Sequence, residues 1–327
     1  MKALVTGGAG FIGSHLAEAL CHRGAQVTVF DNLSSGSLVN LAWRKPGDEV
    51  DLVQGDIRDE SLVRKLVADC DWVFHKAALP SVGYSVAHPA ETDEINSTAT
   101  LKLLIAARDA DVRRFVFASS SAVYGDTEAL PLREQLPVEP ISPYGLQKYA
   151  GERYTQLFHR LYGMPTVAFR YFNVFGPRQS YDSPYSGVIA KFCTAMLHGQ
   201  APLIFGDGLQ SRDFVSVENV VNANLRAAEA TPDQVAGKVF NIATGTGTTL
   251  LQLVGEINRL TGQELVAHHQ PPRAGDIRLS LADISAAQNA FGYEPHSGLQ
   301  AGLGRTLDYY RNQEEQACAA PGAFIRG

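Results

Sequence analysis

The stretch KALVTGGAGFIGSHLAEALCHRGAQVTVFDN, residues 2–32, decides the fold. An apolar run over residues 2–7 leads into glycines, and residues 11–24 repeat apolar side chains at helical spacing. The next apolar run covers residues 25–32 and follows Gly24, a residue typical of a helix C-cap. Strand, helix and strand in this order predict a parallel βαβ unit with a right-handed crossover.

The same alternation continues through the first half of the chain. Further strands are expected at 50–57, 71–78 and 113–120, and helices at 59–70 and 94–110. The pattern therefore predicts an α/β fold of the Rossmann type, with a doubly wound parallel sheet.

The second half changes character at about residue 171, where glycine, proline and aromatic residues separate shorter elements. One more buried strand is expected at 237–245 and one more helix at 249–262. We expect a large domain, a smaller C-terminal α/β lobe interleaved with it, and a flexible tail of little periodicity. The expected bounds are 1–170 with a returning segment at about 214–248, then 171–213 with 249–312, and 313–327.

The composition argues against several functional classes. The formal net charge of −6 argues against nucleic-acid and anionic-membrane binding, because both need a basic face. The four cysteines, Cys21, Cys70, Cys193 and Cys318, match neither a disulfide framework nor a zinc site, so no metal is expected. Separate thiols and the lack of any apolar run of membrane length predict a cytoplasmic protein.

Three glycines, Gly7, Gly10 and Gly13, follow the first expected strand at intervals of three. Glycines there allow a tight turn and the close approach of a pyrophosphate. The following helix begins with Phe11 and Ile12, and its N-terminus supplies unpaired N–H groups and a positive dipole end. Because a strand precedes the glycines and a helix follows, the loop is predicted to bind a dinucleotide.

The second and third expected strands each end in acidic residues. Asp31 lies eighteen residues after Gly13, where an acid accepts hydrogen bonds from the adenosine ribose. Its neighbour Asn32 is neutral, and the segment DNLSSGS has no lysine or arginine for a 2′-phosphate, so NAD is favoured over NADP. Asp56 and Ile57 follow the third strand and are expected near the adenine, although Asp56 is nearly as well suited to capping a helix.

The segment SPYGLQK, residues 142–148, places Tyr144 and Lys148 four residues apart, on one face of a helix. A lysine ammonium beside a tyrosine, together with a positive nicotinamide ring, stabilises the phenolate and lowers the tyrosine pKa. A surface pair is the alternative for this spacing alone. The upstream FASSSAVYG, residues 117–125, favours chemistry, because it lies at the carboxyl end of an expected strand.

At this point the chain resembles the extended short-chain dehydrogenase/reductase family, specifically its NAD-dependent nucleotide-sugar epimerases. The resemblance covers residues 1 to about 310. The motifs that carry it occur in order: TGGAGFIGS, DNLS, GDIRD, HKAA, FASSSAVYG, SPYGLQK, RYFNVFGPRQ, FGDGLQSRDFV and RAGDIRLSLAD.

The resemblance implies a catalytic set of Ser120, Tyr144 and Lys148, with Ser119 or Ser121 as the serine if the alignment shifts by one residue. Tyr144 would take the proton of the sugar 4-hydroxyl, Ser120 would bond that oxygen, and Lys148 would hold the nicotinamide ribose. Hydride would pass from C4 to NAD and return to the opposite face of a 4-keto sugar.

The resemblance also assigns the remaining site residues. NAD would contact the glycine loop and the ends of the strands: Gly7, Gly10, Phe11, Ile12, Gly13, Asp31, Asn32, Asp56, Ile57, Ala77, Ala78, Asn96, Tyr144 and Lys148. A UDP-sugar would contact Ser81, Val82, Ser121, Asn173, Val188, Lys191, Phe205, Arg212, Arg273, Asp276 and Ser280. Each also has a structural reading, such as a core position for Phe205 or a loop brace for Asn96. His75 is interpreted as a core histidine, and most of the HKAA motif as packing.

Two positions bear on the sugar. Ser280 aligns with the residue that faces the sugar C2 substituent, and serine leaves room for an N-acetyl group where a tyrosine would not. Relatives that prefer N-acetylated sugars carry an arginine near the position of Tyr84, and this chain has none there. Both the acetamido sugars and the unsubstituted hexoses therefore remain open.

The sequence thus predicts C4 epimerisation of a UDP-hexose, UDP-N-acetylglucosamine and its galacto epimer first, with UDP-glucose and UDP-galactose next. UDP-glucuronate epimerisation is the nearest alternative, with Arg178 as a candidate cation for the carboxylate. Dehydration and decarboxylation rank lower, because Ser121 and Ala122 replace the acids those enzymes carry before VYG. A non-catalytic dinucleotide sensor would need none of the catalytic set. The resemblance also implies a homodimer formed through two helices, one of which carries Tyr144.

Overall fold

The computed structural model describes residues 1–181, 187–272 and 277–319. Its centre is a seven-stranded sheet in which every neighbouring pair is parallel, in the order β3-β2-β1-β4-β5-β6-β10. The strands are β1 (Lys2–Thr6), β2 (Gln26–Asp31), β3 (Val50–Gln54), β4 (Trp72–His75), β5 (Arg114–Ser120), β6 (Thr166–Tyr171) and β10 (Lys238–Ile242). This confirms the predicted doubly wound sheet. The strand order reverses between β1 and β4, where such sheets bind ligands.

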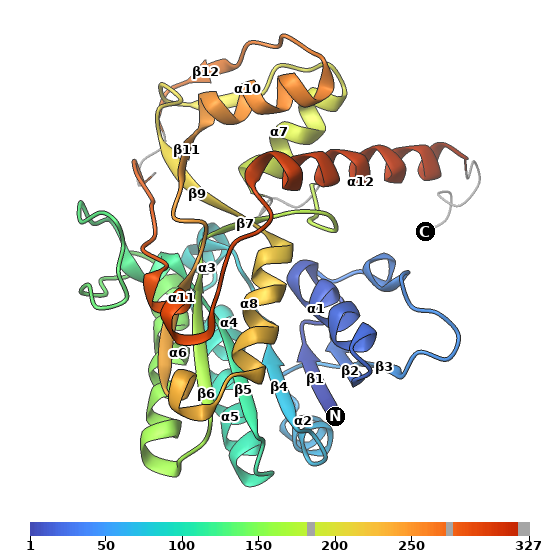
Figure 1. Ribbon diagram of the computed structural model, residues 1–327, viewed down its shortest axis with the longest axis vertical. Helices are drawn as coiled ribbons and strands as arrows, with labels where there is room; N and C mark the ends of the chain where they lie inside the picture. Colours follow the sequence, from blue (N-terminus) through green and yellow to red (C-terminus); the bar gives the residue numbers. More distant parts are fainter. Residues whose placement is uncertain (182–186, 273–276, 320–327) are drawn as a thin grey trace.

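Helices cover both faces of this sheet (Figure 1). On one face lie α1 (Phe11–His22), α8 (Val217–Glu229), the short α9 (Pro232–Val235) and α11 (Ser285–Phe291). On the other lie α2 (Glu60–Val67), α5 (Ala99–Asp109) and α6 (Pro143–Tyr162). Apolar side chains are fully buried against both faces, which is why the central strands read as nearly continuous apolar runs.

Short helical turns connect these elements near the carboxyl edge of the sheet. They are α3 (Val82–Ala87), α4 (Pro89–Asp93), a π-helical turn at Glu94–Thr98 that leads into α5, and 3-10 turns at Leu38–Leu41 and Ser121–Tyr124. The expected helix at 94–110 is therefore present, but its first turn is wider than an α-helix.

The smaller lobe begins directly after β6 and lies over the carboxyl ends of the strands (Figure 1). It contains a three-stranded sheet of β7 (Asn173–Phe175), β9 (Ser211–Ser216) and β11 (Gly247–Thr249), and a pair of β8 (Leu203–Phe205) with β12 (His268–Gln270). Its helices α7 (Val188–Leu197), α10 (Leu250–Thr261) and α12 (Leu299–Ala319) bury a separate apolar core. Between β9 and β11 the chain returns to the large sheet as α8 and β10.

The end of the chain differs from the expected flexible tail. Helix α12 continues to Ala319, seven residues into the segment expected to be flexible, whereas 320–327 lie outside the described residues. Glutamine, glutamate and alanine dominate residues 313–319, and these are good helix formers. The buried side chains of Leu303 and Leu307 anchor the beginning of the helix. Its last turns can therefore continue without an apolar face of their own.

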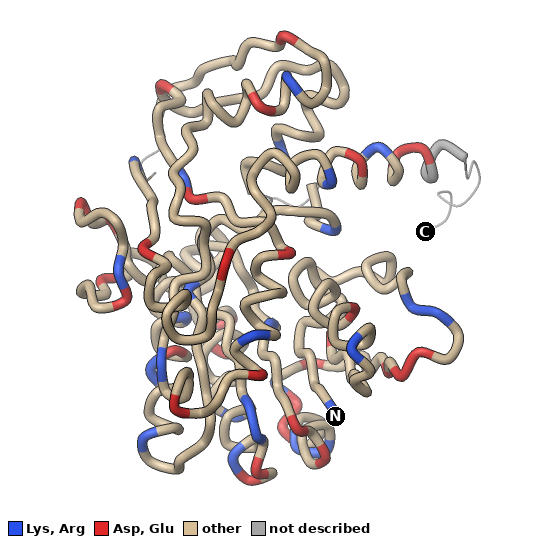
Figure 2. Tube along the Cα trace, viewed as in Figure 1, with Lys and Arg blue, Asp and Glu red and all other residues tan. Residues whose placement is uncertain are grey.

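Charges of both signs are spread over the outer helices and loops of the molecule (Figure 2). Within the described ranges no helix combines the length and apolar character needed to cross a membrane. The same residues contain no cluster of three or more histidine, cysteine, aspartate and glutamate side chains suited to a metal ion.

Candidate active site

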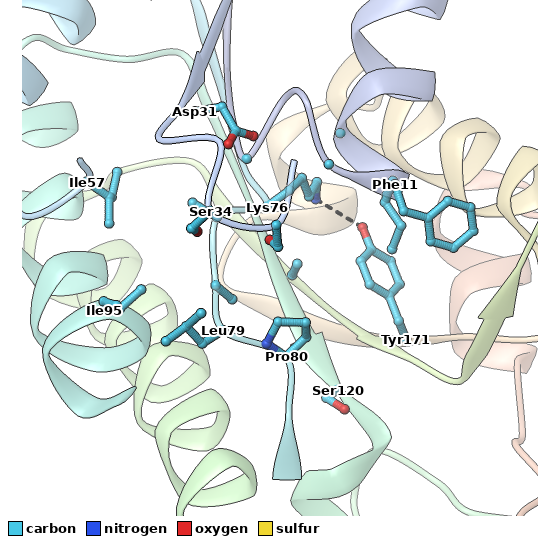
Figure 3. Close-up of a pocket in the computed structure, with 18 of the residues that line it drawn as sticks. Phe11, Asp31, Ser34, Ile57, Lys76, Leu79, Pro80, Ile95, Ser120 and Tyr171 are labelled. Atoms are coloured by element: carbon cyan, nitrogen blue, oxygen red, sulfur yellow. Dashed lines mark hydrogen bonds between the residues drawn. The ribbon is translucent and has the colours of Figure 1, made fainter. Parts of the chain in front are cut away.

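A cavity of about 400 Å³ opens at the carboxyl ends of β1, β2, β4 and β5 (Figure 3). It brings together most of the residues predicted for the cofactor and for catalysis. The predicted residues that line it are Gly7, Gly10, Phe11, Ile12, Gly13, Asp31, Asn32, Ile57, Ala77, Ala78, Ser120, Tyr144 and Lys148.

The glycine loop is packed too tightly for side chains. Gly7 has a φ of +65°, and a Cβ there would lie 2.7 Å from the backbone nitrogen of Ala77. A Cβ on Gly13 would lie 2.1 Å from the Gly7 carbonyl oxygen. Helix α1 begins after Gly10 with no side-chain cap and no acidic residue in its first turn. Its first N–H groups are therefore available for an anion.

Asp31 closes the other side of the loop. Its carboxylate is buried and accepts hydrogen bonds from the N–H groups of Ala9, at 2.9 Å, and Leu33, at 2.8 Å. These bonds hold the acid at the carboxyl end of β2, beside the helix N-terminus. The uncapped helix, the side-chain-free loop and this acid fit a dinucleotide with an unphosphorylated ribose, which is NAD.

Two predicted cofactor residues lie outside the cavity lining. Asp56 does not cap α2, a role that Asp59 takes. Its carboxylate instead binds Arg58 at 2.7 Å, and the bond with Arg58 lowers the pKa of Asp56. Asn96 is buried and bonds the backbone of Leu79 through both ends of its amide, at 2.8 and 3.1 Å. Asn96 therefore braces the loop after β4. This loop includes Leu79, which lines the cavity.

Helix α6 carries Tyr144 and Lys148 to the cavity. Ser142 caps the helix by accepting the Gly145 N–H at 3.1 Å. A Cβ at Gly151 would lie 2.4 Å from the Phe117 ring, so this glycine lets α6 pack directly on β5. This close packing brings the helix to the end of β5, where Ser120 lies.

The Ser120 side chain acts on the Tyr144 hydroxyl and favours a lower pKa of that group. The Ser119 hydroxyl instead donates to the buried Glu152 at 3.0 Å, and Ser121 begins the following 3-10 turn. Of the three serines, Ser120 is therefore the one that acts on Tyr144, and its catalytic role stays a prediction.

Burial dominates the electrostatics of Tyr144 and Lys148. Burial raises the pKa of Tyr144 to about 12, and the bond from Ser120 opposes this only in part. Burial also lowers the pKa of Lys148 to about 8. The Lys148 ammonium donates to the Ala118 carbonyl oxygen at 2.9 Å and lies 5.9 Å from the Tyr144 ring centroid. In the protein alone, loss of water around the phenolate outweighs the effect of Ser120. The expected fall in the tyrosine pKa also involves the positive nicotinamide ring, and it stays a prediction for the enzyme with NAD bound.

The predicted substrate residues that the structure describes do not line this cavity, and most of them lie in the smaller lobe. Asn173 lies on β7 and Arg212 on the adjoining β9. Ser280 is buried, and its N–H bonds the Ser211 carbonyl at 3.1 Å, which holds it beside the same sheet. Arg273 and Asp276 lie outside the described residues.

The other predicted substrate residues lie on separate elements. Val188 is half-buried and Lys191 exposed on α7, and Phe205 is half-buried at the end of β8. Ser81 caps α3 by accepting the Tyr84 N–H at 3.0 Å, and Val82 is exposed.

Sequence reasoning missed part of the cavity wall. Lys76 was interpreted mostly as packing, and Tyr171 was not considered, yet both line the cavity. The position of Lys76 directly after a strand and before the two alanines could have identified it. His75 is a core residue as expected, bonded to Thr6 at 2.7 Å and to Thr100 at 2.8 Å. The other missed lining residues are Phe30, Ser34, Ser35, Gly55, Leu79, Pro80, Ile95, Ala118, Ser119, Phe172, Val174 and Gln179.

The NAD dependent epimerase/dehydratase family matches residues 3–243. This chain belongs to that family. It is therefore an NAD-dependent enzyme, in agreement with the fit of its cavity to the dinucleotide.

Named relatives share this sequence and fold. Over 317 residues the chain is 38% identical to the UDP-glucose 4-epimerase of Mycolicibacterium smegmatis, covering 96% of this chain and 100% of that protein. It is 41% identical, with a TM-score of 0.90, to the UDP-N-acetylglucosamine 4-epimerase of Methanobrevibacter ruminantium M1 in complex with UDP-N-acetylmuramic acid, covering 95% and 98% of the two chains. It is 31% identical, with a TM-score of 0.88, to the UDP-glucuronic acid 4-epimerase of Bacillus cereus in complex with UDP-glucuronic acid and NAD, covering 96% and 100%.

Proposed function

We propose that this NAD-dependent UDP-sugar 4-epimerase interconverts UDP-N-acetylglucosamine and UDP-N-acetylgalactosamine, and that it also accepts UDP-glucose and UDP-galactose. The observation that carries the proposal is that Ser120, Tyr144 and Lys148 share one cavity with the glycine loop and Asp31. Relatives at 38% and 41% identity bear the names of a UDP-glucose and a UDP-N-acetylglucosamine 4-epimerase, which supports both pairs of sugars.

In the proposed reaction Tyr144 accepts the proton of the sugar 4-hydroxyl, and Ser120 donates a hydrogen bond to the same oxygen. NAD, when bound, supplies a reversible hydride acceptor at C4. Lys148 holds the nicotinamide ribose and, since its pKa is about 8, brings a positive charge near the phenol at neutral pH. Once the 4-keto sugar has rotated so that its opposite face accepts the returning hydride, Tyr144 returns the proton and C4 is inverted.

The nucleotide half of the substrate is proposed to bind across the cleft, on the smaller lobe. Asn173 lies on β7, directly after β6, and Arg212 lies on the adjoining β9, which supports a role for both at the diphosphate. Arg273 would add a second cation and Asp276 would bond the uridine ribose. Val188, Lys191 and Phe205 would enclose the uracil, and Ser81, Val82, Ser121 and Ser280 the sugar.

A neutral hexose is favoured over a uronic acid at this site. The candidate partner for a substrate carboxylate, Arg178, forms an ion pair with Glu18 of α1. A guanidinium already paired with a protein carboxylate offers little to a second one, so UDP-glucuronate ranks below the hexoses.

Purified protein incubated with UDP-N-acetylglucosamine, without added NAD, is expected to form the galacto epimer, as followed by proton NMR. A bulky side chain at Ser280 would occupy the space proposed for the N-acetyl group. Ser280→Tyr is therefore expected to lower kcat/KM for UDP-N-acetylglucosamine by about tenfold or more and to spare UDP-glucose.

Leu279→Tyr is the matched control, because Leu279 is the preceding residue and is exposed. It is expected to change neither sugar's rate. Absence of conversion of every UDP-hexose tested would reject the epimerase, and equal losses for both sugars in Ser280→Tyr would reject the role of Ser280.

We also propose a homodimer formed through α6, located in the cytoplasm as the separate thiols suggest. Leu146, Leu157 and Leu161 lie along one face of α6, at intervals of eleven and four residues, and all three are exposed. Light scattering is expected to give twice the chain mass of 35.3 kDa. Leu157→Glu is expected to give the monomer, whereas Leu251→Glu, on an exposed position of α10, should leave the dimer intact. A monomeric parent protein would contradict the proposal.

A further inference from the structure

Lys76 is a cation in the wall of the NAD cavity with no role in the mechanism above. It directly follows β4, and its side chain points toward the Tyr171 hydroxyl (Figure 3). Its position is held firmly. The preceding His75 is locked inward by Thr6 and Thr100, and the Ala77 N–H donates to the Thr6 hydroxyl at 3.2 Å.

The Lys76 ammonium has few hydrogen-bond partners within the protein. Among the described residues its one hydrogen-bond partner is the Tyr171 hydroxyl, at 3.0 Å. That hydroxyl also accepts the Asn224 amide at 2.8 Å. Two of the three ammonium N–H groups therefore have no protein acceptor in the described part of the chain.

No carboxylate neutralises this charge within the described ranges. Lys76 takes part in no ion pair there, and Asp31, the one acid of the cavity lining, is bonded to backbone N–H groups. Burial and the charge of Lys148 lower the pKa of Lys76 well below its usual value. A partly buried cation without an anionic partner is unfavourable, so the arrangement is more favourable when an anion enters the cavity.

The glycine loop indicates where that anion lies. A Cβ on Gly7 would be 2.9 Å from the Lys76 carbonyl carbon, so the backbone of Lys76 borders the loop that receives the pyrophosphate. Lys148, the other cation of the described lining, is directed to the Ala118 carbonyl at the end of β5. Lys76 is thus the cation whose backbone adjoins the loop.

We propose that Lys76 binds the pyrophosphate of NAD through its ammonium group. The ammonium adds a charge-assisted hydrogen bond to the N–H groups of α1. It remains bonded to Tyr171, which orients it. This role concerns cofactor binding alone, so it stands whichever sugar the enzyme converts.

The test is a competition for the cofactor site. Purified protein is first freed of bound NAD and equilibrated with fluorescent etheno-NAD, and ADP or adenosine is then added as competitor. In Lys76→Met the inhibition constant of ADP is expected to rise by about 10- to 100-fold, because a bond to a charged group is lost. The inhibition constant of adenosine, which lacks phosphates, is expected to stay within about twofold.

Two further variants separate charge from packing. Lys76→Arg keeps the cation and is expected to retain most of the ADP affinity. Tyr171→Phe removes the partner but leaves the lysine, and it is expected to weaken ADP less than Lys76→Met does. Unchanged ADP competition in Lys76→Met would overturn the proposal. Equal weakening of ADP and adenosine would also overturn it, since that pattern marks a collapsed pocket.

Discussion

Tyr144→Phe is expected to lower kcat for epimerisation by about 10²- to 10⁴-fold, the range that a positioned proton-transfer group contributes. The substitution removes only the hydroxyl that Ser120 bonds at the end of β5. The ring, which lies on α6 beside the cavity, stays in place. Proton NMR of the UDP-sugar, at substrate concentrations well above KM, measures the loss.

Tyr149→Phe is the matched control, because it removes a half-buried tyrosine hydroxyl from the same helix outside the cavity lining. It is expected to keep the parent rate. Both variants should retain bound NAD, measured after denaturation of the purified protein. A Tyr144→Phe enzyme within tenfold of the parent kcat would show that another group moves the proton.

Arg170→Met is expected to lower the free energy of unfolding by about 3–5 kcal/mol, because it leaves Glu152 as an uncompensated buried charge. The two side chains are 3% and 2% exposed and meet at 2.6 Å. Arg170 also lies over the Tyr124 ring and bonds the Glu134 carbonyl. The pair joins α6 to β6 behind the catalytic residues. Urea unfolding with a common m-value measures the difference.

A double variant separates the buried charge from the lost packing. Glu152→Met combined with Arg170→Met removes both charges and is expected to be more stable than Arg170→Met alone. Glu256→Gln breaks an exposed pair with Arg259 and is expected to change stability by no more than about 1 kcal/mol. A loss below about 1 kcal/mol in Arg170→Met would contradict a structural role for the buried pair.

The alternation of strands and helices was predictable because it rests on local periodicity. Each expected strand and helix of the first half is present, with ends that differ by a few residues. The π-helical turn at Glu94–Thr98 was not predictable, because Asn96 is held there by bonds to the distant Leu79 and Gln147. The extension of α12 was missed for a related reason, since burial of its first turns does not appear as periodicity in its last ones.

The candidate site was predictable where one motif contains the whole geometry. The glycine loop with Asp31, and Tyr144 with Lys148 on one helix face, needed only the distances of a βαβ unit and a helix turn. Residues whose role depends on a contact with another helix or strand were harder to predict from the sequence. Lys76 is one of them, because its partner Tyr171 lies on β6.

The sequence by itself determined the parallel sheet, the dinucleotide loop and the placing of Tyr144 and Lys148 on one helix face, because spacing along a strand or helix is a local property. Tertiary structure alone decided the electrostatics. Burial removes water from the Tyr144 phenol and raises its pKa in the protein alone. Lys76 becomes a candidate phosphate ligand, because β4, β6 and the glycine loop meet around it. Both effects depend on which groups surround a charge, and distant segments supply those groups only when the chain is folded.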